Sequence, residues 1–272
     1  MSDDGWMIWL EWLTTGTAGF VGYWLILIAV AGLEVAQPGR QPQASGQRPS
    51  GHRIATNLGL GLIASALNSI PLLSEVAMAQ VAIQQGWGLL NQWTGSAALK
   101  VAASFIACDL LAYAVHRLSH SWPPLWRLHR VHHADSHIDL STLFRIHPLT
   151  IPVLMGINFT AIVALGIHPL GILLHGAVKL VTMGLGHASV APRPGLSRIV
   201  AWLFVTPAFH HRHHSAFQPE TDSNYSEVLT LWDRLFGTFT PSTNPIARIG
   251  LGALYDDGAG SLPAQLKLPF QS

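Results

Sequence analysis

Histidine is the residue whose type and spacing in this sequence most clearly indicate chemistry. Fourteen of the fifteen histidines lie between residues 116 and 214. Three short clusters, HRLSH at 116–120, HRVHH at 129–133 and HHRHH at 210–214, place imidazoles three or four positions apart. Residues with this spacing share one face of a helix, so each cluster is predicted to present two or three rings together. Imidazole is a good ligand for iron, zinc and copper, and the clusters therefore predict a metal site.

The candidate ligands outnumber the positions around one metal ion, so two ions are expected. The eight residues on the shared faces are His116, His120, His129, His132, His133, His210, His213 and His214. His187, in GLGHASVAP, lies just past an apolar hairpin and is a ninth candidate. One helical pair of histidines is more often structural, but three clusters on the same predicted face favour ligation. The isolated histidines are expected to be structural: His52 in a loop, His168 at the hairpin turn and His175 inside its second arm.

Other metal chemistries fit the pattern less well. A zinc protease of the His-Glu-x-x-His type needs a glutamate after its first histidine, and Arg117 stands there. Bis-histidine haem sites in membrane bundles use rings that face each other across helices, which tight triplets do not provide. Cys108 is the only cysteine, so an intrachain disulfide and a cysteine-ligated zinc or iron–sulfur centre are excluded. A non-catalytic, histidine-rich metal or haem protein of the membrane remains an alternative of another class.

The elements that must position these histidines are apolar helices. Only 11% of residues are charged, against roughly a quarter in soluble domains. The uncharged stretches 12–33 and 54–74 are each long enough to cross a hydrocarbon core of about 30 Å. Residues 101–115 lead directly into the first cluster, and 148–186 reads as a helical hairpin around GIHPLG. The predicted fold is all-α: an integral membrane bundle of about four spans, hairpin included, with a histidine-rich helical cap.

Basic residues predict the orientation of this bundle. Threading the chain through the membrane in order brings three groups of arginines to one side, which the positive-inside rule makes cytoplasmic. These groups are Arg40, Arg48 and Arg53, then Arg117, Arg127, Arg130 and Arg145, then Arg193, Arg198 and Arg212. The histidine clusters are therefore expected on the cytoplasmic face of an inner or plasma membrane. The acidic N-terminus lacks the basic region of a secretory signal, so no cleaved peptide is expected. A net charge of +1 indicates no nucleic-acid partner.

The order of the clusters resembles the fatty acid hydroxylase / sterol desaturase superfamily of integral membrane di-iron enzymes. DLLAYAVHRLSH, LWRLHRVHHAD, FRIHPLT, TPAFHHRHHS and DSNYSEVLTLWDRLFGTF are similar to successive blocks of that family. The resemblance covers roughly residues 100–240, which implies a catalytic domain there. Residues 1–99 would then form an N-terminal membrane region with two helices and a polar loop, and 241–272 a C-terminal tail. It also implies that the three boxes and His187 hold two iron ions, with O2 as co-substrate.

The resemblance gives further polar residues a meaning. Asp109 and Tyr113 share a helical face with the first histidine box, and Asp109 is expected to orient a ligand ring. The family's closing motif is matched by Asn224, Tyr225, Trp232 and Asp233, of which Asp233, or else Asp222, is expected to brace histidines. Trp232 is expected to pack the cap. His147 matches a His-Pro block without a settled metal contact, His211 occupies a variable position of the third box, and His137 has no predicted role.

The implied activity is O2-dependent hydroxylation of a C–H bond in a membrane lipid: fatty acyl, sterol-like or another. A desaturase of the same superfamily, resembling sterol C-5 desaturase, is the alternative, because both reactions begin with hydrogen abstraction. No dinucleotide-binding glycine motif, flavin fingerprint or CxxC is present. Electrons are therefore expected from an external donor, which the resemblance implies to be a cytochrome b5, a ferredoxin or a reductase.

Overall fold

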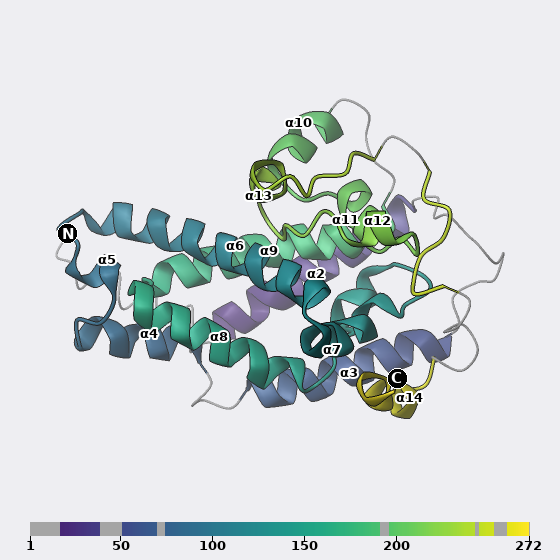
Figure 1. Cartoon of the computed structure of the whole chain (residues 1–272), viewed down its shortest axis with the longest axis horizontal. Coiled ribbons are helices and arrows are strands. Elements are labelled where there is room, and N and C mark those ends of the chain that lie inside the picture. Colours follow the sequence, from purple (N-terminus) through teal and green to yellow (C-terminus); the bar gives the residue numbers. More distant parts are fainter. Residues whose placement is uncertain are drawn as a thin grey trace.

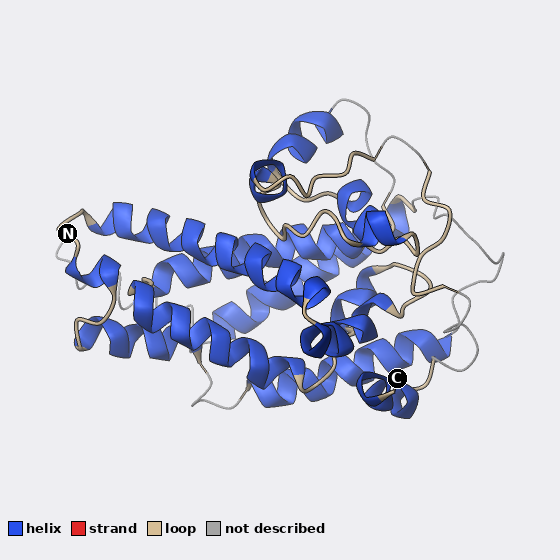
Figure 2. Cartoon of the chain, in the orientation of Figure 1, coloured by secondary structure: helices blue, strands red, loops and turns tan. Residues whose placement is uncertain are grey.

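The computed structural model describes residues 17–38, 51–69, 74–190, 196–242, 245–252 and 260–271. Over these residues the chain is a set of helices joined by loops (Figures 1 and 2), and β-type backbone pairing is limited to isolated bridges such as that between Phe204 and Leu229. The all-α class predicted from the sequence is confirmed.

Three helices are long and apolar enough to cross a membrane: α2 (Thr17–Ala36), α6 (Ala97–Ser121) and α9 (Pro169–His187). The apolar helix α8 (Thr150–Leu165) is shorter. Helices α6 and α9 pack side by side along the bundle (Figure 1), and Gly171 makes this possible, because a Cβ there would lie 2.4 Å from the Ser104 Cβ. The predicted membrane bundle is therefore confirmed. The first residues of the predicted span 12–33 lie outside the described part of the chain.

The second predicted span is a helix of a different character. Helix α3 (Gly51–Asn68) is not among the three candidate spans of the described residues. It buries Arg53 and Asn57, both of which contact the Asp135 carboxylate, at 2.7 and 2.8 Å. These contacts tie α3 to the histidine-bearing cap. His52 lies in the first turn of this helix, so the prediction that it sits in a loop is wrong.

The predicted hairpin consists of α8, a tight turn and α9. Gly166 ends α8 with a φ of 69°, in the left-handed region that glycine adopts readily. His168 then caps α9, with its ring accepting a hydrogen bond from the Leu170 amide, as expected for a histidine at the turn. Helix α4 (Glu75–Gln84) packs against both arms, and Ala79 and Ile162 belong to the apolar core between them.

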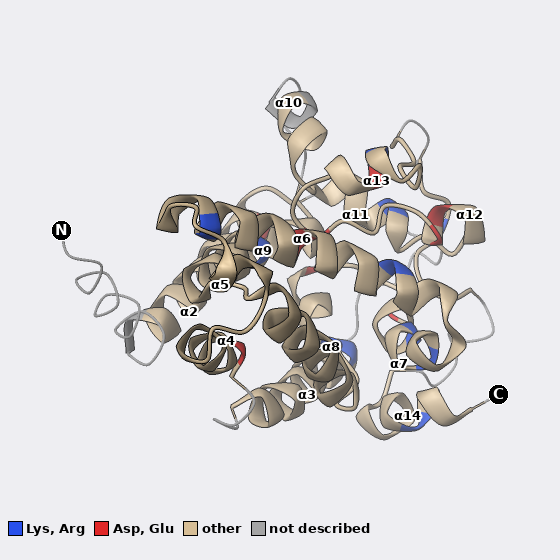
Figure 3. Cartoon of the chain, turned by 60° about the vertical axis from the view of Figure 1, so that its left-hand side comes forward, with Lys and Arg blue, Asp and Glu red and all other residues tan. Residues whose placement is uncertain are grey.

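The short helix α5 (Leu89–Gln92) lies at one end of the bundle (Figure 1). The remaining helices gather mainly toward the other end and form the cap. They are α7 (Pro123–His133), α10 (Leu196–Leu203), α11 (Pro207–His213), α12 (Gln218–Thr221), α13 (Leu231–Leu235) and α14 (Leu262–Lys267), with 3-10 turns at Leu140–Phe144 and Leu268–Phe270. Most charged residues of the described chain lie toward the end that carries α7, α11 and α12 (Figure 3). Arg130 of α7 donates hydrogen bonds to the carbonyls of Leu268 and Gln271, so the C-terminal segment docks onto the cap.

Candidate metal centre

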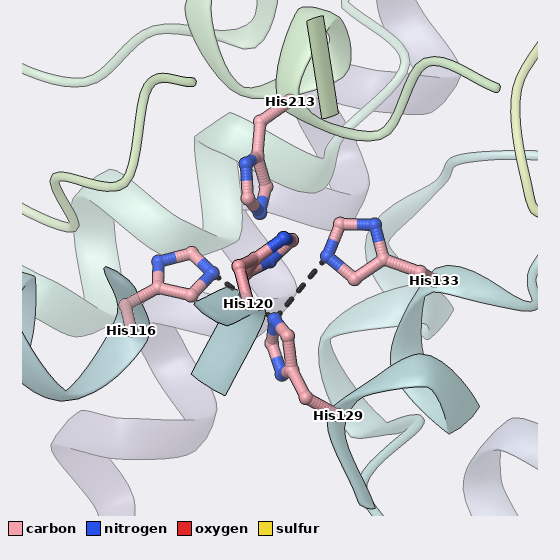
Figure 4. A group of neighbouring side chains, drawn as sticks. All are labelled: His116, His120, His129, His133 and His213. Atoms are coloured by element: carbon pink, nitrogen blue, oxygen red, sulfur yellow. Dashed lines mark hydrogen bonds between the residues drawn. The ribbon is translucent and has the colours of Figure 1, made fainter. Parts of the chain in front are cut away.

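Five histidines from three helices converge on one point beside the end of α6. They are His116 and His120 from α6, His129 and His133 from α7, and His213 from α11 (Figure 4), and their ligand nitrogens all lie within 4.8 Å of one another. The His129 Nε2 atom lies 3.1 Å from the His116 Nε2 and 3.2 Å from the His133 Nε2. We call these residues the five-histidine group.

A second convergence, the four-histidine group, lies directly beside the first. It consists of His132 from α7, His187 from α9, and His210 and His214 from the third box. The His187 Nε2 atom is 3.1 Å from the His132 Nε2 and 3.0 Å from the His210 Nε2, which is 3.2 Å from the His214 Nε2. The rings of His133 and His214, one from each group, stack with centroids 4.5 Å apart. The nine predicted ligands are thus brought together as two adjacent groups.

The geometry of both groups fits a metal ion. Metal–imidazole bonds of about 2.0–2.1 Å place neighbouring ligand nitrogens about 3.0–3.4 Å apart around one ion, and the Nε2 separations of 3.0–3.2 Å lie in this range. The buried Nε2 atoms of His120 and His213 have no hydrogen-bond partner among the described residues. Buried polar atoms are normally paired, so these nitrogens are available to a cation.

The outer nitrogens of three of the rings are held by backbone carbonyls. The Nδ1 atoms of His116, His187 and His213 donate to the carbonyl oxygens of Tyr225, Met183 and Ser223, at 2.7, 2.8 and 2.8 Å. A neutral imidazole that donates through Nδ1 keeps its lone pair on Nε2. Such hydrogen bonds fix the tautomer and the direction of a metal ligand. Here they direct the Nε2 lone pairs into the two groups.

Burial keeps these imidazoles neutral. Desolvation, followed by repulsion from neighbouring histidines, holds the pKa of each ring outside the candidate spans well below its ordinary value near 6.5. These rings are His129, His132, His133, His210, His213 and His214. Neutral imidazole is the form that binds metal, so the site favours ligation at neutral pH.

Short helices set the direction of the second and third boxes. Pro123 begins α7, and Pro207 begins α11 behind the Thr206 cap, whose side chain accepts a hydrogen bond from the Phe209 amide. Proline in the first turn is compatible with a helix because its missing N–H has no intrahelical partner there. Arg145 supports the end of α7 by donating to the Val131 carbonyl at 2.8 Å. Both boxes therefore start on defined turns and face α6 and α9.

Asp109 contacts a different set of residues from the one predicted. Its buried carboxylate accepts a hydrogen bond from the Trp232 indole at 2.8 Å and one from the Leu229 amide at 3.3 Å, and it lies 3.4 Å from the His175 Nε2. None of its described contacts is with the nine histidines. The expectation that it orients a ligand ring is corrected: Asp109 fastens the segment around α13 to α6. Helical spacing could not indicate this, because Trp232 lies 123 residues away.

Tyr113 is buried beside Asp109 but does not reach the histidine nitrogens through any described hydrogen bond. Its hydroxyl pairs with the Thr238 hydroxyl at 2.9 Å, and its ring stacks on Phe236 with centroids 5.4 Å apart. The centroid of Tyr225, which packs against the five-histidine group, lies 6.3 Å from that of Tyr113. Tyr113 thus contributes to the wall behind Tyr225, and its predicted catalytic role stays a prediction.

Hydrogen bonds connect the closing motif to the five-histidine group. Asp233, fully buried, accepts hydrogen bonds from the Tyr225 and Ser226 amides at 2.9 and 2.8 Å and from the Thr238 hydroxyl at 2.6 Å. Because the Tyr225 carbonyl pairs with His116, Asp233 is connected to that ring through the backbone, and its role in bracing the histidines stays a prediction.

Two further carboxylate and amide side chains of this region have direct contacts. Asp222 lies 3.3 Å from the Nδ1 of His120 and is partly exposed. Asn224 adopts a φ of 57°, which asparagine tolerates better than most residues. Its side-chain amide donates to the carbonyls of Phe209 and Thr240, so it locks the loop after α12 to the start of α11.

The remaining histidines lie outside both groups. His147 is buried, and its ring interacts with the Leu266 carbonyl and the Leu149 amide. His137 supplies its carbonyl to Arg53 and Thr142. Burial lowers the pKa of His211 to about 4, and the backbone carbonyls of residues 187 and 188 are its neighbours. His175 lies in α9, as predicted, beside Asp109.

Comparisons with known proteins agree with this picture. The model of the fatty acid hydroxylase family matches residues 101–238. The chain is 30% identical over 223 residues to the ornithine lipid hydroxylase OlsE of Rhizobium tropici, an alignment that covers 80% of this chain and 64% of that protein. It is 30% identical over 143 residues to the alkylglycerol monooxygenase of Danio rerio, covering 53% of this chain and 31% of the relative.

The human alkylglycerol monooxygenase is 27% identical over 235 residues, covering 84% of this chain and 48% of the relative. The chain therefore spans less than two thirds of the length of each of these relatives. No solved structure matches the chain.

Proposed function

Because the chain belongs to the fatty acid hydroxylase family, we propose that it is a membrane oxygenase that uses O2 to hydroxylate a C–H bond of a membrane lipid. The observation that carries this proposal is the pair of adjacent histidine groups beside helices able to span a membrane. Members of this family are iron-dependent oxygenases. The names of the relatives, a hydroxylase of ornithine lipid and monooxygenases of alkylglycerol, add support for a lipid substrate.

We propose that each histidine group holds one iron ion, the five-histidine group through residues of α6, α7 and α11 and the four-histidine group through residues of α7, α9 and α11. Bound iron would supply the O2 activation that cleavage of an unactivated C–H bond requires. The chain's own residues supply the neutral rings and fix their direction through carbonyl acceptors such as those of Tyr225 and Met183. They also keep water away, because His133, His213 and His214 are almost fully buried.

The orientation, the domain limits and the electron donor belong to the same proposal. Basic residues near the cap support a cytoplasmic site by the positive-inside rule. The family match supports a catalytic domain close to 100–240, preceded by a membrane region and followed by a tail that docks through Arg130. The sequence has no dinucleotide or flavin motif, so we propose that a soluble or membrane-bound redox protein delivers the electrons.

Metal analysis and lipid mass spectrometry test this function. Protein purified without oxygen should contain about two irons and no haem band, and cells that express it should gain lipids heavier by one oxygen atom. Loss of two hydrogens instead would indicate the desaturase alternative, and haem or a single loosely held zinc would overturn the assignment.

Alanine variants test the site itself. His132→Ala and His213→Ala should each lose metal and lipid oxygenation together, because each removes a ring from one group. His52→Ala is the matched control, because His52 is exposed on α3 and belongs to neither group. Full activity in both ligand variants would refute the site assignment.

A further inference from the structure

We propose that a groove on the outer face of α6 binds the substrate lipid, with Arg117 contacting an anionic group of its head. That the bound lipid is the substrate rests on the proposed function, whereas binding of a lipid in the groove does not depend on it. The groove has a volume of about 360 Å³ and lies between α6 and Phe236, which follows α13. Volumes of roughly 300–1,000 Å³ are usual for small-molecule sites. Its lining is mainly apolar, and we call it the α6 groove.

The α6 groove runs along the direction of a membrane lipid chain. Leu110, Ala114 and Leu118 line it and recur every four residues, which places them in one stripe along the helix. From Leu110 to Ser121, its last lining residue on α6, the rise is about 16 Å. That is about half of a hydrocarbon core of roughly 30 Å. The groove therefore matches the depth of one leaflet.

The position of the groove identifies a lipid as its occupant. It lies on a helix long and apolar enough to cross a membrane, so its open side belongs to the surface that acyl chains would contact. Leu118 and Phe236 line it while remaining 43% and 47% exposed. Leu231 and Leu235 of α13, the helix that Phe236 follows, are 50% and 64% exposed. Exposed apolar side chains that continue a membrane-facing surface are solvated by lipid, and the groove is the hollow in that surface.

The end of the groove nearest the histidines is polar. Arg117 and Ser121 line it within the last two turns of α6. The described hydrogen bond of Arg117 is a 3.4 Å contact with the Tyr113 hydroxyl, which leaves most guanidinium donors for a ligand. Guanidinium binds phosphate and carboxylate groups through two parallel hydrogen bonds. A lipid whose chain fills the apolar stripe would thus place an anionic headgroup at Arg117, at the membrane surface.

Two aromatic rings connect the α6 groove to the five-histidine group. Tyr113 lines the groove, and its centroid lies 6.3 Å from that of Tyr225. Tyr225 in turn lies 5.2 Å from His120 and 5.8 Å from His116 between centroids. A lipid held in the groove is therefore separated from the ligand rings by this pair of tyrosines alone along that line.

Lipid binding to the purified, metal-loaded protein tests the groove without relying on catalysis. The probes are palmitoyl-oleoyl phosphatidylglycerol and the neutral diacylglycerol with the same chains, titrated by native mass spectrometry. Ala114→Trp fills the stripe and should weaken both lipids at least ten-fold. Ala102→Trp, at an exposed site about 18 Å along α6 from Ala114, is the control and should bind as wild type.

Arg117→Gln separates the headgroup contact from the chain contact. It should weaken phosphatidylglycerol about ten-fold and leave diacylglycerol unchanged, because it removes a charge-assisted contact only. Arg127→Gln, at an exposed position on α7, is its control. Wild-type binding by Ala114→Trp, or equal effects of Arg117→Gln on both lipids, would overturn the proposal.

Lipid oxygenation in membranes separates this proposal from the proposed function. If the wild type is active and Ala114→Trp retains its iron, the variant should lose at least nine tenths of the activity. Equal activity with iron retained would overturn the groove as the substrate site and leave the function intact. A wild type that oxygenates no lipid would overturn the function, while the binding titrations would still decide whether the groove holds lipid.

Discussion

Replacement of Asp233 by asparagine tests whether the loop after the third box positions a metal ligand. The carboxylate accepts three hydrogen bonds, from the Tyr225 and Ser226 amides and the Thr238 hydroxyl, in a fully buried place. Hydrogen bonds to charged groups contribute about 1.5–3 kcal/mol each, and neutral ones about half as much. An asparagine keeps one oxygen and turns an N–H toward a backbone donor. The free energy of unfolding should therefore fall by about 4 kcal/mol.

This loss should leave a folded protein, since domains are stable by about 5–15 kcal/mol. The informative effect is on metal binding, because the Tyr225 carbonyl holds the Nδ1 of His116. Loss of such an outer partner costs about 10–100-fold in metal affinity or activity. Iron affinity, measured by anaerobic competition with a chelator, should fall by at least ten-fold in Asp233→Asn.

The matched control is Asp222→Asn. Asp222 lies 3.3 Å from the Nδ1 of His120, but its side chain is 39% exposed. Exposed pairs contribute about 0–1 kcal/mol, and asparagine keeps an oxygen that can accept a hydrogen bond from the His120 Nδ1, so this variant should lose little stability and less affinity than Asp233→Asn. An Asp233→Asn protein that melts earlier yet binds iron as tightly as the wild type would refute the positioning role and leave Asp233 a purely structural residue.

Three other measurements follow from the same contacts. Iron added without oxygen at about a hundred times its dissociation constant should raise the free energy of unfolding by about 2.7 kcal/mol. If iron raised the melting temperature of the wild type no more than that of His213→Ala, this would contradict binding at the five-histidine group. Arg53→Ala should lower the free energy of unfolding by about 3–5 kcal/mol, because it leaves the buried Asp135 without its ion pair. Urea unfolding measures this change, and unchanged stability would count against the pairing of α3 with the cap. Trp232→Phe should cost about 1.5–3 kcal/mol by removing the 2.8 Å hydrogen bond to Asp109, and the same melting temperature as the wild type would show that α13 is held by packing alone.

The ligand candidates could be predicted from the sequence because their signal is local. Helical spacing places His129 and His133 on one face whatever surrounds the helix, and the structure brings both into the five-histidine group. The groups that hold the outer nitrogens carry no such signal. The acceptors for His116 and His187 are backbone carbonyls, which every residue has, so only the folded path of the chain selects them.

Long-range partners explain the differences between expectation and structure. The stretch 54–74 is uncharged in sequence, but the polar residues at the start of α3 pair with Asp135, some 80 residues away. The uncharged run by itself suggested a span, whereas α3 begins with polar residues and is not apolar enough to count among the candidate spans of the described residues. Asp109 is a similar case. Its spacing from His116 predicted that it orients a metal-binding histidine ring, but its contacts are with Trp232 and His175.

The repeated His-x-x-His-His box gains its meaning from the way the structure divides it. Around a helix, a residue four positions after another is rotated from it by about 40°, whereas a residue three positions after it is rotated by about 60° in the opposite direction. In α7 the outer pair, His129 and His133, serves the five-histidine group and His132 serves the four-histidine group. The third box reverses this assignment: His210 and His214 serve the four-histidine group and His213 the five-histidine group.

Each of the two His-x-x-His-His boxes therefore contributes to both groups, which one metal ion could not require. His132 is the only ring that α7 gives to the four-histidine group, and His213 is the only ring that the third box gives to the five-histidine group. Removing His132 takes the last α7 ring from the four-histidine group and leaves two α7 rings in the five-histidine group. Removing His213 takes the last ring of the third box from the five-histidine group and leaves two in the four-histidine group. Loss of His213 should thus empty the five-histidine group before the four-histidine group, and loss of His132 should do the reverse. Equal loss of both irons in both variants would instead mean that the two groups bind metal as a single cooperative unit.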